Sequence, residues 1–378
     1  MPGSAPGRTR SSSRTGGSTS SSETSLLVHG QEPLNAEPAP GRLVESFLTP
    51  NDLFYVRNHG PVPEVDAASY RLHVQGAVER PLRLSLPELR DRFSRVSIEA
   101  TLSCAGNRRA QLTRVRPIPG EIPWGDGAIG TARWSGVPLR EVLAAAVLTP
   151  EARHVELTGL DACKEDGRVV PFAGSIPVEK ALAGETIIAD EMNGEPLPPV
   201  HGFPLRAVVP GFVGARSVKW LSAIALAREP SSSYYQTRSY RLFGPDVQGT
   251  DARWEEALPL GELAVNAAIC RPHDGESLPA GRVVVAGWAV GGGQRAVARV
   301  DVSGDGGATW ARAELARGET PSAWCLWSAE LELAPGPHEL VARAVDSSTN
   351  SQPESPAATW NFKGYANNAC PRVRVLTE

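Results

Sequence analysis

The sequence predicts an α+β protein in which a mixed domain of helices and strands precedes an all-β, immunoglobulin-like sandwich. A chain of 378 residues with ample apolar content is long enough for about two domains, each with its own core. From about residue 40 to about residue 250, short apolar runs broken by Pro and Gly stand among a few helical patterns. Beyond about residue 258, strand-length runs separated by turn residues follow one another.

Two helices and two strands can be placed in the first domain. The run Ser85-Leu86-Pro87-Glu88 has the spacing of a capping box and precedes apolar residues, so we expect a short helix to begin there. An amphipathic helix is expected after Pro138, where apolar residues recur three or four positions apart, at Leu139, Val142, Leu143, Ala146 and Val147. The segments 71–78 and 207–209 are typical of strands.

The all-β domain is predicted from runs of strand length at 281–290, 297–302, 309–315, 323–333 and 338–345. Ala298, Val300 and Val302 alternate with polar residues, and Gly304-Asp305-Gly306-Gly307 supplies a tight turn before Trp310. This pattern predicts a hairpin with one buried face. Five or more such strands in about 120 residues favour an immunoglobulin-like sandwich, although no Cys-Trp-Cys spacing of the antibody type is present.

We therefore expect a disordered segment over residues 1–25, the mixed domain over 26–255 and the sandwich over 256–378. The first segment consists of Ser, Thr, Gly, Arg and Pro with almost no apolar side chain, and such a composition cannot bury enough surface to offset the entropy of ordering.

Composition excludes several classes of function. The formal net charge of −4 argues against a general nucleic-acid-binding protein. No apolar run approaches the roughly 20 residues needed to cross a bilayer, so no membrane association is expected. No apolar stretch of signal-peptide length follows the early arginines, and the cytoplasm is the default compartment.

Cys104 carries the strongest chemical signal, in the run Ser103-Cys104-Ala105-Gly106-Asn107-Arg108-Arg109. Arginine neighbours favour the thiolate, which attacks electrophiles or binds soft metals, and they attract oxyanions. A lone cysteine is more often a small buried hydrophobe. The other cysteines are scattered and form no Cys-x-x-Cys pair, so a disulfide scaffold or zinc knuckle is not expected. Nucleophile, redox sensor and metal ligand all remain open for Cys104.

Other polar residues cluster on expected loops, each with a plainer alternative. The segment 57–63 ends in prolines and is also typical of a rigid surface loop. The run His201-Gly202-Phe203-Pro204-Leu205-Arg206 offers a histidine that is more often structural than a ligand. In 210–219, glycines allow backbone N–H groups to approach an anion beside Arg216 and Lys219, without the spacing of a P-loop. Asp161 could accept hydrogen bonds from a heterocycle or simply occupy a turn.

Taken in order along the chain, these motifs resemble those of the molybdenum-dependent sulfite oxidases. The resemblance rests on Cys-Ala-Gly-Asn-Arg-Arg at 104–109 and on the segments at 57–59, 130–134, 201–206, 214–219 and 360–361. It covers about residues 30 to 378 and is closest to stand-alone, haem-free members.

The resemblance implies that Cys104 is the one protein ligand to molybdenum, whose remaining ligands come from a tightly bound, buried molybdopterin and from oxygen. A soft thiolate suits that metal. The family's cofactor-holding positions are matched by Tyr55, Val56, Arg57, Asn58, His59, Asp161, His201, Arg206, Ser217, Val218 and Lys219.

The implied substrate is sulfite, which is oxidised to sulfate by oxygen transfer from molybdenum to sulfur. Arg57 and Arg109 match the family's sulfite-binding arginines, Trp124 an aromatic residue that lines the substrate pocket, and Tyr240 a tyrosine beside the reactive oxygen. Lys363 stands where the family has a third sulfite-binding arginine; lysine retains the charge but loses the two-pronged guanidinium.

Further departures from the family pattern are expected to alter sulfite affinity, proton handling or local packing. Ser239 replaces an acidic residue before the tyrosine, and a lysine common before the tryptophan is replaced near Pro119. Cys370-Pro371 stands in place of a Trp-His pair.

The resemblance also implies a homodimer formed through the second domain. No haem is expected, since residues 1–40 are too short and too polar to hold one. Electrons would then pass directly to oxygen or to an external cytochrome. Two alternatives remain open: a related molybdenum reductase acting on nitrate, another oxyanion or an S-oxide, and a non-catalytic adhesion protein in which Cys104 has no role.

Overall fold

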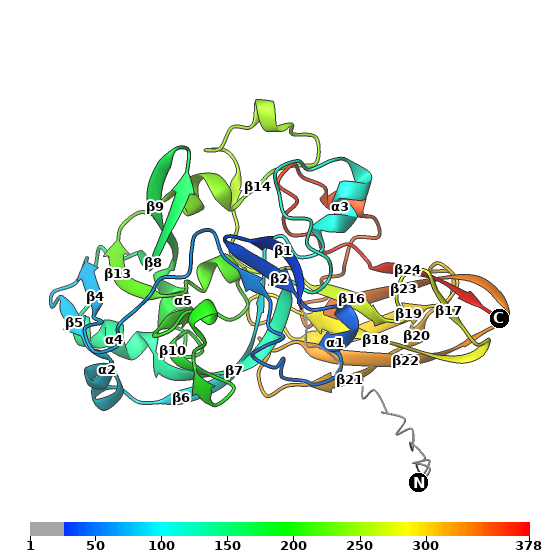
Figure 1. Ribbon diagram of the computed structural model, residues 1–378, viewed down its shortest axis with the longest axis horizontal. Helices are drawn as coiled ribbons and strands as arrows, with labels where there is room; N and C mark the ends of the chain where they lie inside the picture. The colour runs from blue at the N-terminus through cyan, green and yellow to red at the C-terminus, as the bar shows by residue number, and fades with distance from the viewer. Residues whose placement is uncertain (1–25) are drawn as a thin grey trace, which may run out of the picture.

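The computed structural model describes residues 26–378, so the expected disorder of 1–25 falls outside it. The chain forms two adjoining halves, with the mixed helices and strands on one side and a pair of β-sheets on the other (Figure 1). None of the helices in the described residues is both long and apolar enough to span a membrane.

Three sheets build the first half. The smallest contains β1 (Leu27–Gln31), β2 (Leu34–Glu37) and β3 (Val56–Arg57). The second contains, in order, β11 (Glu195–Pro196), β10 (Ile187–Met192), β7 (Ile129–Pro138) and β6 (Val96–Ser103), with β12 (Arg206–Val208) also paired to β10. The third contains, in order, β5 (Leu82–Leu84), β4 (Leu72–Gly76), β13 (Leu221–Ala227), β8 (His154–Glu165) and β9 (Arg168–Pro177).

The helices of this half are short: α1 (Pro40–Leu43), α2 (Leu86–Arg92), α3 (Arg109–Val115), α4 (Leu139–Ala146) and α5 (Val178–Leu182). The capping box predicted for α2 is present, because Glu88 N donates to Ser85 Oγ at 3.3 Å and Ser85 N donates to the Glu88 carboxylate at 2.8 Å. The predicted apolar face of α4 is buried, while Val147 lies beyond the helix with a φ of 56°.

Two sheets form the second half and enclose one core. One contains β16 (Asn266–Arg271), β18 (Gly281–Val290), β22 (Cys325–Leu333) and β21 (Glu314–Arg317). The other contains β17 (Glu276–Leu278), β24 (Arg372–Thr377), β23 (Gly336–Asp346), β19 (Val297–Ser303) and β20 (Ala311–Arg312). Val285 and Trp327 from the first sheet pack with Val300 and Leu340 from the second. A two-stranded ribbon of β14 (Arg241–Leu242) and β15 (Leu258–Pro259) lies between the halves in the chain.

Two details differ from the predictions for this half. The run 309–315 is not one strand: β20 pairs with β19, whereas β21 pairs with β22 in the other sheet, and buried Ala313 lies between them. In β19 the alternation predicted from Ala298 is wrong, because a register shift between Val297 and Arg299 leaves Ala298 exposed. The predicted hairpin of β19 and β20 is confirmed.

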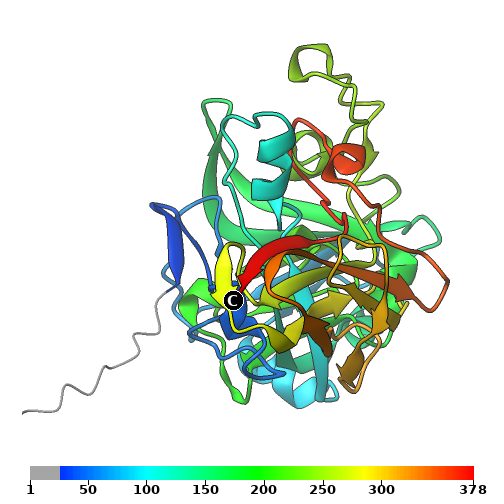
Figure 2. The ribbon, with the colours of Figure 1, turned by 90° about the vertical axis from the view of Figure 1, so that its right-hand side faces the viewer.

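The two halves meet around α3. Trp360, from the segment after β23, packs with Leu112 and Ile118, and its indole Nε1 donates to Arg116 O at 3.1 Å. Both ribbon views place α3 beside this C-terminal segment (Figures 1 and 2). The C-terminal segment around Trp360 is therefore held against α3, the helix that follows Cys104 in the sequence.

Candidate active site

The Cys104 loop joins the end of β6 to α3. Cys104 N donates to Ala128 O at 2.9 Å, and Gly106 N donates to Cys104 Sγ at 3.4 Å. Glycine at 106 leaves room for the guanidinium of Arg109, since a Cβ there would lie 2.5 Å from it and the side chain would have to shift. Across the halves, Ala366 N donates to Ala105 O at 2.8 Å. The thiol is thus held from both sides of the molecule.

Burial dominates the protonation of Cys104. It raises the pKa of the thiol, and the charges of Arg57 and Arg109 offset this only in part. As expected from the sequence, the charge of Arg109 favours the thiolate, but desolvation outweighs it. The other cation that acts on the thiol is Arg57, which is distant in sequence, and not the neighbour Arg108.

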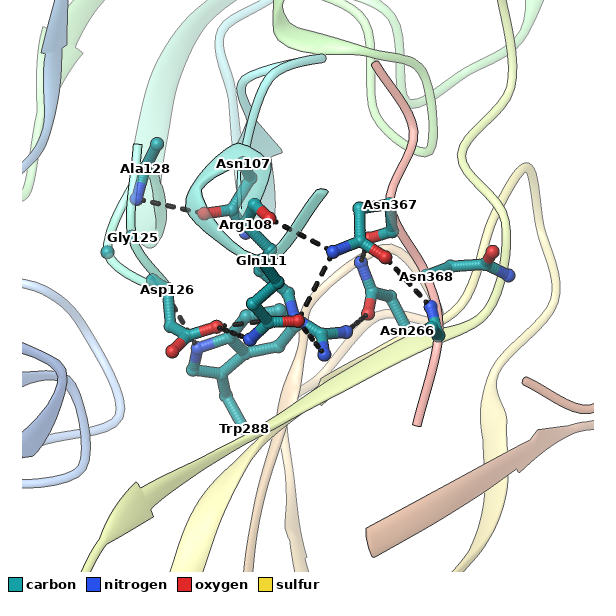
Figure 3. A network of polar contacts seen from close by, with 12 residues as sticks. Asn107, Arg108, Gln111, Gly125, Asp126, Ala128, Asn266, Trp288, Asn367 and Asn368 are labelled. Carbon is teal, nitrogen blue, oxygen red and sulfur yellow. Dashed lines mark hydrogen bonds and ion pairs between the residues drawn. The ribbon is translucent and has the colours of Figure 1, made fainter. Parts of the chain in front are cut away.

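Arg108 extends into a polar network between the halves (Figure 3). Its backbone is left-handed, with φ 65°, so its side chain diverges from that of Arg109. The fully buried guanidinium donates to Asn266 Oδ1 at 2.6 Å and to Gln111 Oε1 at 2.9 Å, and it forms an ion pair with Asp126 at 3.2 Å. Asn367 Nδ2 donates to Arg108 O at 2.9 Å. Arg108 therefore joins the halves and does not face the candidate site.

A cavity opens beside the Cys104 thiol. Of the residues predicted to hold a cofactor or to catalyse, those that line it are Tyr55, Arg57, Asn58, His59, Cys104, Asp161, His201, Arg206, Ser217, Val218, Lys219 and Tyr240. The lining residues that the motif reasoning did not assign to the site are Phe54, Ala105, Phe172, Gly214, Ala215 and Trp220. Phe54 directly precedes the Tyr55 segment and could have been found by extending it; Phe172 carries no comparable signal.

Val56 differs from its neighbours in this set. It is buried in β3, where it pairs with Ala36, and is not among the lining residues. Because successive strand residues point to opposite faces, Tyr55 and Arg57 reach the cavity while Val56 faces away.

At one end of the cavity, three cationic or titratable groups are buried with neutral partners. Arg206 donates to the carbonyl oxygens of His201 and Ser217, at 2.9 and 3.2 Å. Lys219 Nζ donates to Asn58 Oδ1 and to Val200 O. Burial lowers the pKa of Arg206 to about 10 and that of His201 to about 3, and it lowers the pKa of Lys219 well below its ordinary value. Among the described residues no carboxylate forms an ion pair with Arg206 or Lys219, so this end of the cavity suits an anion.

Closer to the thiol, His59 and Tyr240 share a hydrogen bond of 3.0 Å between Nε2 and the phenol oxygen. Burial, followed by the charges of Arg57 and Lys219, lowers the pKa of His59 well below its ordinary value, and burial raises that of Tyr240. Both groups are therefore neutral near pH 7. Tyr240 directly follows a single π-helical turn, η3 (Tyr235–Ser239), of the kind often found at functional sites.

Arg109, Trp124 and Lys363 lie beside the cavity lining but are not part of it. Arg109 donates to Ile122 O at 2.8 Å, and its guanidinium lies 5.2 Å from the ring centroid of Tyr365. Lys363 pairs with Glu121. Trp124 is fully buried, edge-on to His29 at 4.9 Å between ring centroids. The pocket-lining role expected of Trp124 has no counterpart in this geometry.

The departures from the family pattern fall in different places. Ser239 ends η3 and directly precedes Tyr240, which stacks on Tyr365. Pro119 is exposed in the loop after α3. Cys370 lies buried in the second half, where its N donates to Pro353 O at 2.7 Å.

The residues fit the implied cofactor. Within the described part of the chain, three lining residues have a buried polar atom without a protein partner, namely Asn58 Nδ2, Asp161 Oδ1 and Arg206 Nε, and such atoms indicate a polar ligand. Within residues 26–378, no three His, Cys, Asp or Glu side chains come together as metal ligands, so a metal at Cys104 needs further donors from a cofactor. Molybdopterin, with its sulfur ligands and phosphate, supplies both kinds of group.

Comparison with known proteins agrees with this geometry. The model of the oxidoreductase molybdopterin-binding domain matches residues 59–235, and that of the Mo-co oxidoreductase dimerisation domain matches residues 258–378. Sulfite oxidase of Gallus gallus is 47% identical over 92% of this chain and 77% of its own length, and that of Arabidopsis thaliana is 40% identical over 92% and 93%. For the mitochondrial enzyme of Homo sapiens the identity is 45%, over 93% of this chain and 65% of that protein.

A solved structure agrees over nearly the whole chain. The sulfane dehydrogenase SoxCD from Paracoccus pantotrophus has a TM-score of 0.77 and 25% identity, covering 95% of this chain and 92% of that one. A nitrate reductase of Hordeum vulgare is 38% identical over 93% of this chain and 42% of its own length. The resemblance found in the sequence motifs is confirmed, and the chain belongs to the sulfite oxidase family of molybdopterin-binding oxidoreductases.

Proposed function

We propose that the protein oxidises sulfite to sulfate with a molybdenum–molybdopterin cofactor bound in the cavity at Cys104. The observation that carries this proposal is a buried cavity with a single thiol on its wall and, at one end, cations that have no carboxylate partner within the described residues. The overall reaction converts sulfite and water into sulfate, two protons and two electrons.

The chain's own part is binding and orientation. Lys219, Arg206 and His201 suit the anionic end of the cofactor, and Asn58 and Asp161 suit its polar heterocycle. Cys104 supplies the protein's thiolate. When bound, molybdenum and its pterin supply oxygen transfer and electron storage, which no side chain here provides.

Arg57 is placed to hold the substrate's oxygens, since it lines the cavity together with Cys104. Sulfite must present its sulfur lone pair to the cofactor, so cations have to face its oxygens. Arg109 and Lys363 are the second and third cations of this set, and their charged groups lie 5.2 and 5.8 Å from the ring centroid of Tyr365. The hydrogen bond between Tyr240 and His59 holds a proton between the phenol oxygen and Nε2, beside the same space.

We further propose a homodimer formed by the second half and an immunoglobulin-like class for its two sheets. The match to a dimerisation-domain model and the single core between the sheets support these assignments. Oxygen or an external cytochrome is the proposed electron acceptor. All five cysteines are free thiols, which supports a reducing compartment such as the cytoplasm.

The proposal is tested by isolating the protein from a host that makes molybdopterin, measuring its molybdenum content and following acceptor reduction with sulfite and with nitrate. We expect bound molybdenum and turnover with sulfite. Turnover with nitrate alone would favour the reductase alternative, and folded, metal-free protein would favour the binding-protein alternative.

Cys104→Ser tests the role of the thiol directly. It should fold normally but lose turnover by several orders of magnitude, because a hydroxyl is a hard and poorly ionised ligand. Thermal unfolding and molybdenum content, measured on the same preparation, separate loss of chemistry from loss of fold. Turnover close to that of the unaltered protein would remove Cys104 from the mechanism.

A further inference from the structure

Glu121 holds two of the three cations expected to receive the substrate's oxygens. Its Oε1 pairs with Lys363 Nζ, and its Oε2 lies 3.5 Å from Arg109 Nη2. Glu121 belongs to the loop after α3, whereas Lys363 comes from the C-terminal segment that packs against that helix. One carboxylate thus bridges the two halves and partly neutralises both cations.

This cluster lies next to the cavity and is sheltered from solvent. The exposed fractions of the Arg109, Glu121 and Lys363 side chains are 3%, 18% and 21%. Arg109 lies over the ring of Tyr365, which stacks on Tyr240 with 5.5 Å between ring centroids, and Tyr240 lines the cavity. Partial burial makes the ion pairs stronger than those on an open surface.

The field of the carboxylate extends across this layer. Burial raises the pKa of Tyr365, and the negative charge of Glu121 raises it further. Arg109 is fixed by more than Glu121, since its Nε donates to the carbonyl oxygens of Lys363 and Gly364, each at 3.1 Å. Glu121 can therefore be displaced or neutralised without releasing the Arg109 side chain.

We propose that Glu121 is a specificity-determining residue that competes with the substrate oxyanion for Arg109 and Lys363. The inference rests on the proposed function and deepens it. A doubly charged oxyanion beside Arg57 is attracted less strongly by these two cations because the carboxylate partly neutralises them, and the negative charge of Glu121 also acts on Arg57 itself. Glu121 therefore weakens the binding of sulfite and sulfate, and it acts more strongly on a dianion than on a monoanion.

The test compares the cofactor-loaded protein with Glu121→Gln by calorimetric titration with sulfate and with nitrate. We expect Glu121→Gln to lower the Kd for sulfate about tenfold and that for nitrate about threefold, because the repulsion scales with the charge of the anion. In turnover, the KM for sulfite should fall with little change in kcat, as expected when ground state and transition state gain equally.

Two control variants separate charge from structure. Glu121→Asp keeps the charge and should bind sulfate nearly as the unaltered protein does. Glu185 pairs with Lys180, with 2.6 Å between Oε1 and Nζ, and neither residue lines the cavity. Glu185→Gln should therefore leave the Kd for sulfate unchanged. It loses the same formal charge, so it controls for the net charge of the chain.

An unchanged or higher Kd in Glu121→Gln, or an equal change in Glu185→Gln, would overturn the inference. If the unaltered protein fails to oxidise sulfite, the proposed function falls, but the ratio of sulfate affinities still decides the role of Glu121. If sulfite is oxidised with the same KM in both proteins, only the inference falls.

Discussion

Two groups of buried cations lie close to the Cys104 loop and differ in their partners. Within residues 26–378, Arg206 and Lys219 at the cavity donate to neutral oxygens, and polar atoms around them lack protein partners. Arg108, at the centre of the network in Figure 3, is instead paired with Asp126 and two amide side chains. A buried cation without an ion-paired carboxylate indicates a site for an external anion, whereas a paired one indicates a structural joint.

The first group of cations is tested by replacing Lys219. Lys219→Gln keeps a donor for Asn58 and Val200 but removes the charge, so molybdenum retained after purification should fall at least about tenfold. The cofactor-free variant should unfold at a temperature no lower than the unaltered protein, because the cost of burying an ammonium group has been removed. Metal analysis and thermal unfolding measure the two effects.

Lys180→Gln is the matched control for that experiment. Lys180 is also mostly buried, at 10% exposed, but it has a carboxylate partner in Glu185. Its removal should leave molybdenum retention intact. Equal loss of metal in both variants would show that the absence of a counter-charge does not identify the anion site.

The second group is tested by Arg108→Met, which leaves Asp126 without its ion pair and Asn266 without its donor. We expect the free energy of unfolding to fall by about 3 kcal/mol in urea titration. The exposed pair of Arg282 and Glu330 is the control, and Arg282→Met should leave the free energy of unfolding nearly unchanged. A cost for Arg108→Met as small as that for Arg282→Met would refute the structural role of the network.

The smallest effect concerns pH. The pKa of His201 is about 3 in the folded protein against an ordinary value of 6.5, and burial also depresses that of His59. Between pH 3 and pH 6.5 the unfolded chain binds more protons than the folded protein does. The stability of the cofactor-free protein should therefore decrease as pH falls below about 6.5. His201→Asn should reduce the proton uptake on unfolding near pH 5 by about one, measured from stability against pH. An unaltered slope would mean that His201 titrates normally.

Much of the fold was accessible from local pattern. The limits of β18 coincide with the predicted run 281–290, because an apolar run of strand length is flanked by turn-forming Pro and Gly residues on both sides. The division of 309–315 between β20 and β21 could not be predicted, because so short a run could pair with either sheet. Only the packing of the two sheets determines where the chain passes from one to the other.

The site was predictable where side chains act within collinear motifs, as at Tyr55 to His59 and Ser217 to Lys219. It was not predictable where direction decides the role. Arg108 and Arg109 are chemically identical neighbours, and only the left-handed backbone at Arg108 sends them to different places. Glu121 was missed because its importance depends on Lys363, 242 residues further along the chain.

The left-handed backbone conformation of Arg108 has a mechanical consequence. One side chain is locked into the joint between the halves, and the next lies beside the cavity, while Cys104 precedes both in the same loop. Any rotation of one half against the other must pull on this short stretch of backbone. The position of the thiol therefore depends on the packing of the β-sheets. Substitutions that loosen that packing should displace the Cys104 thiol, the metal's protein ligand.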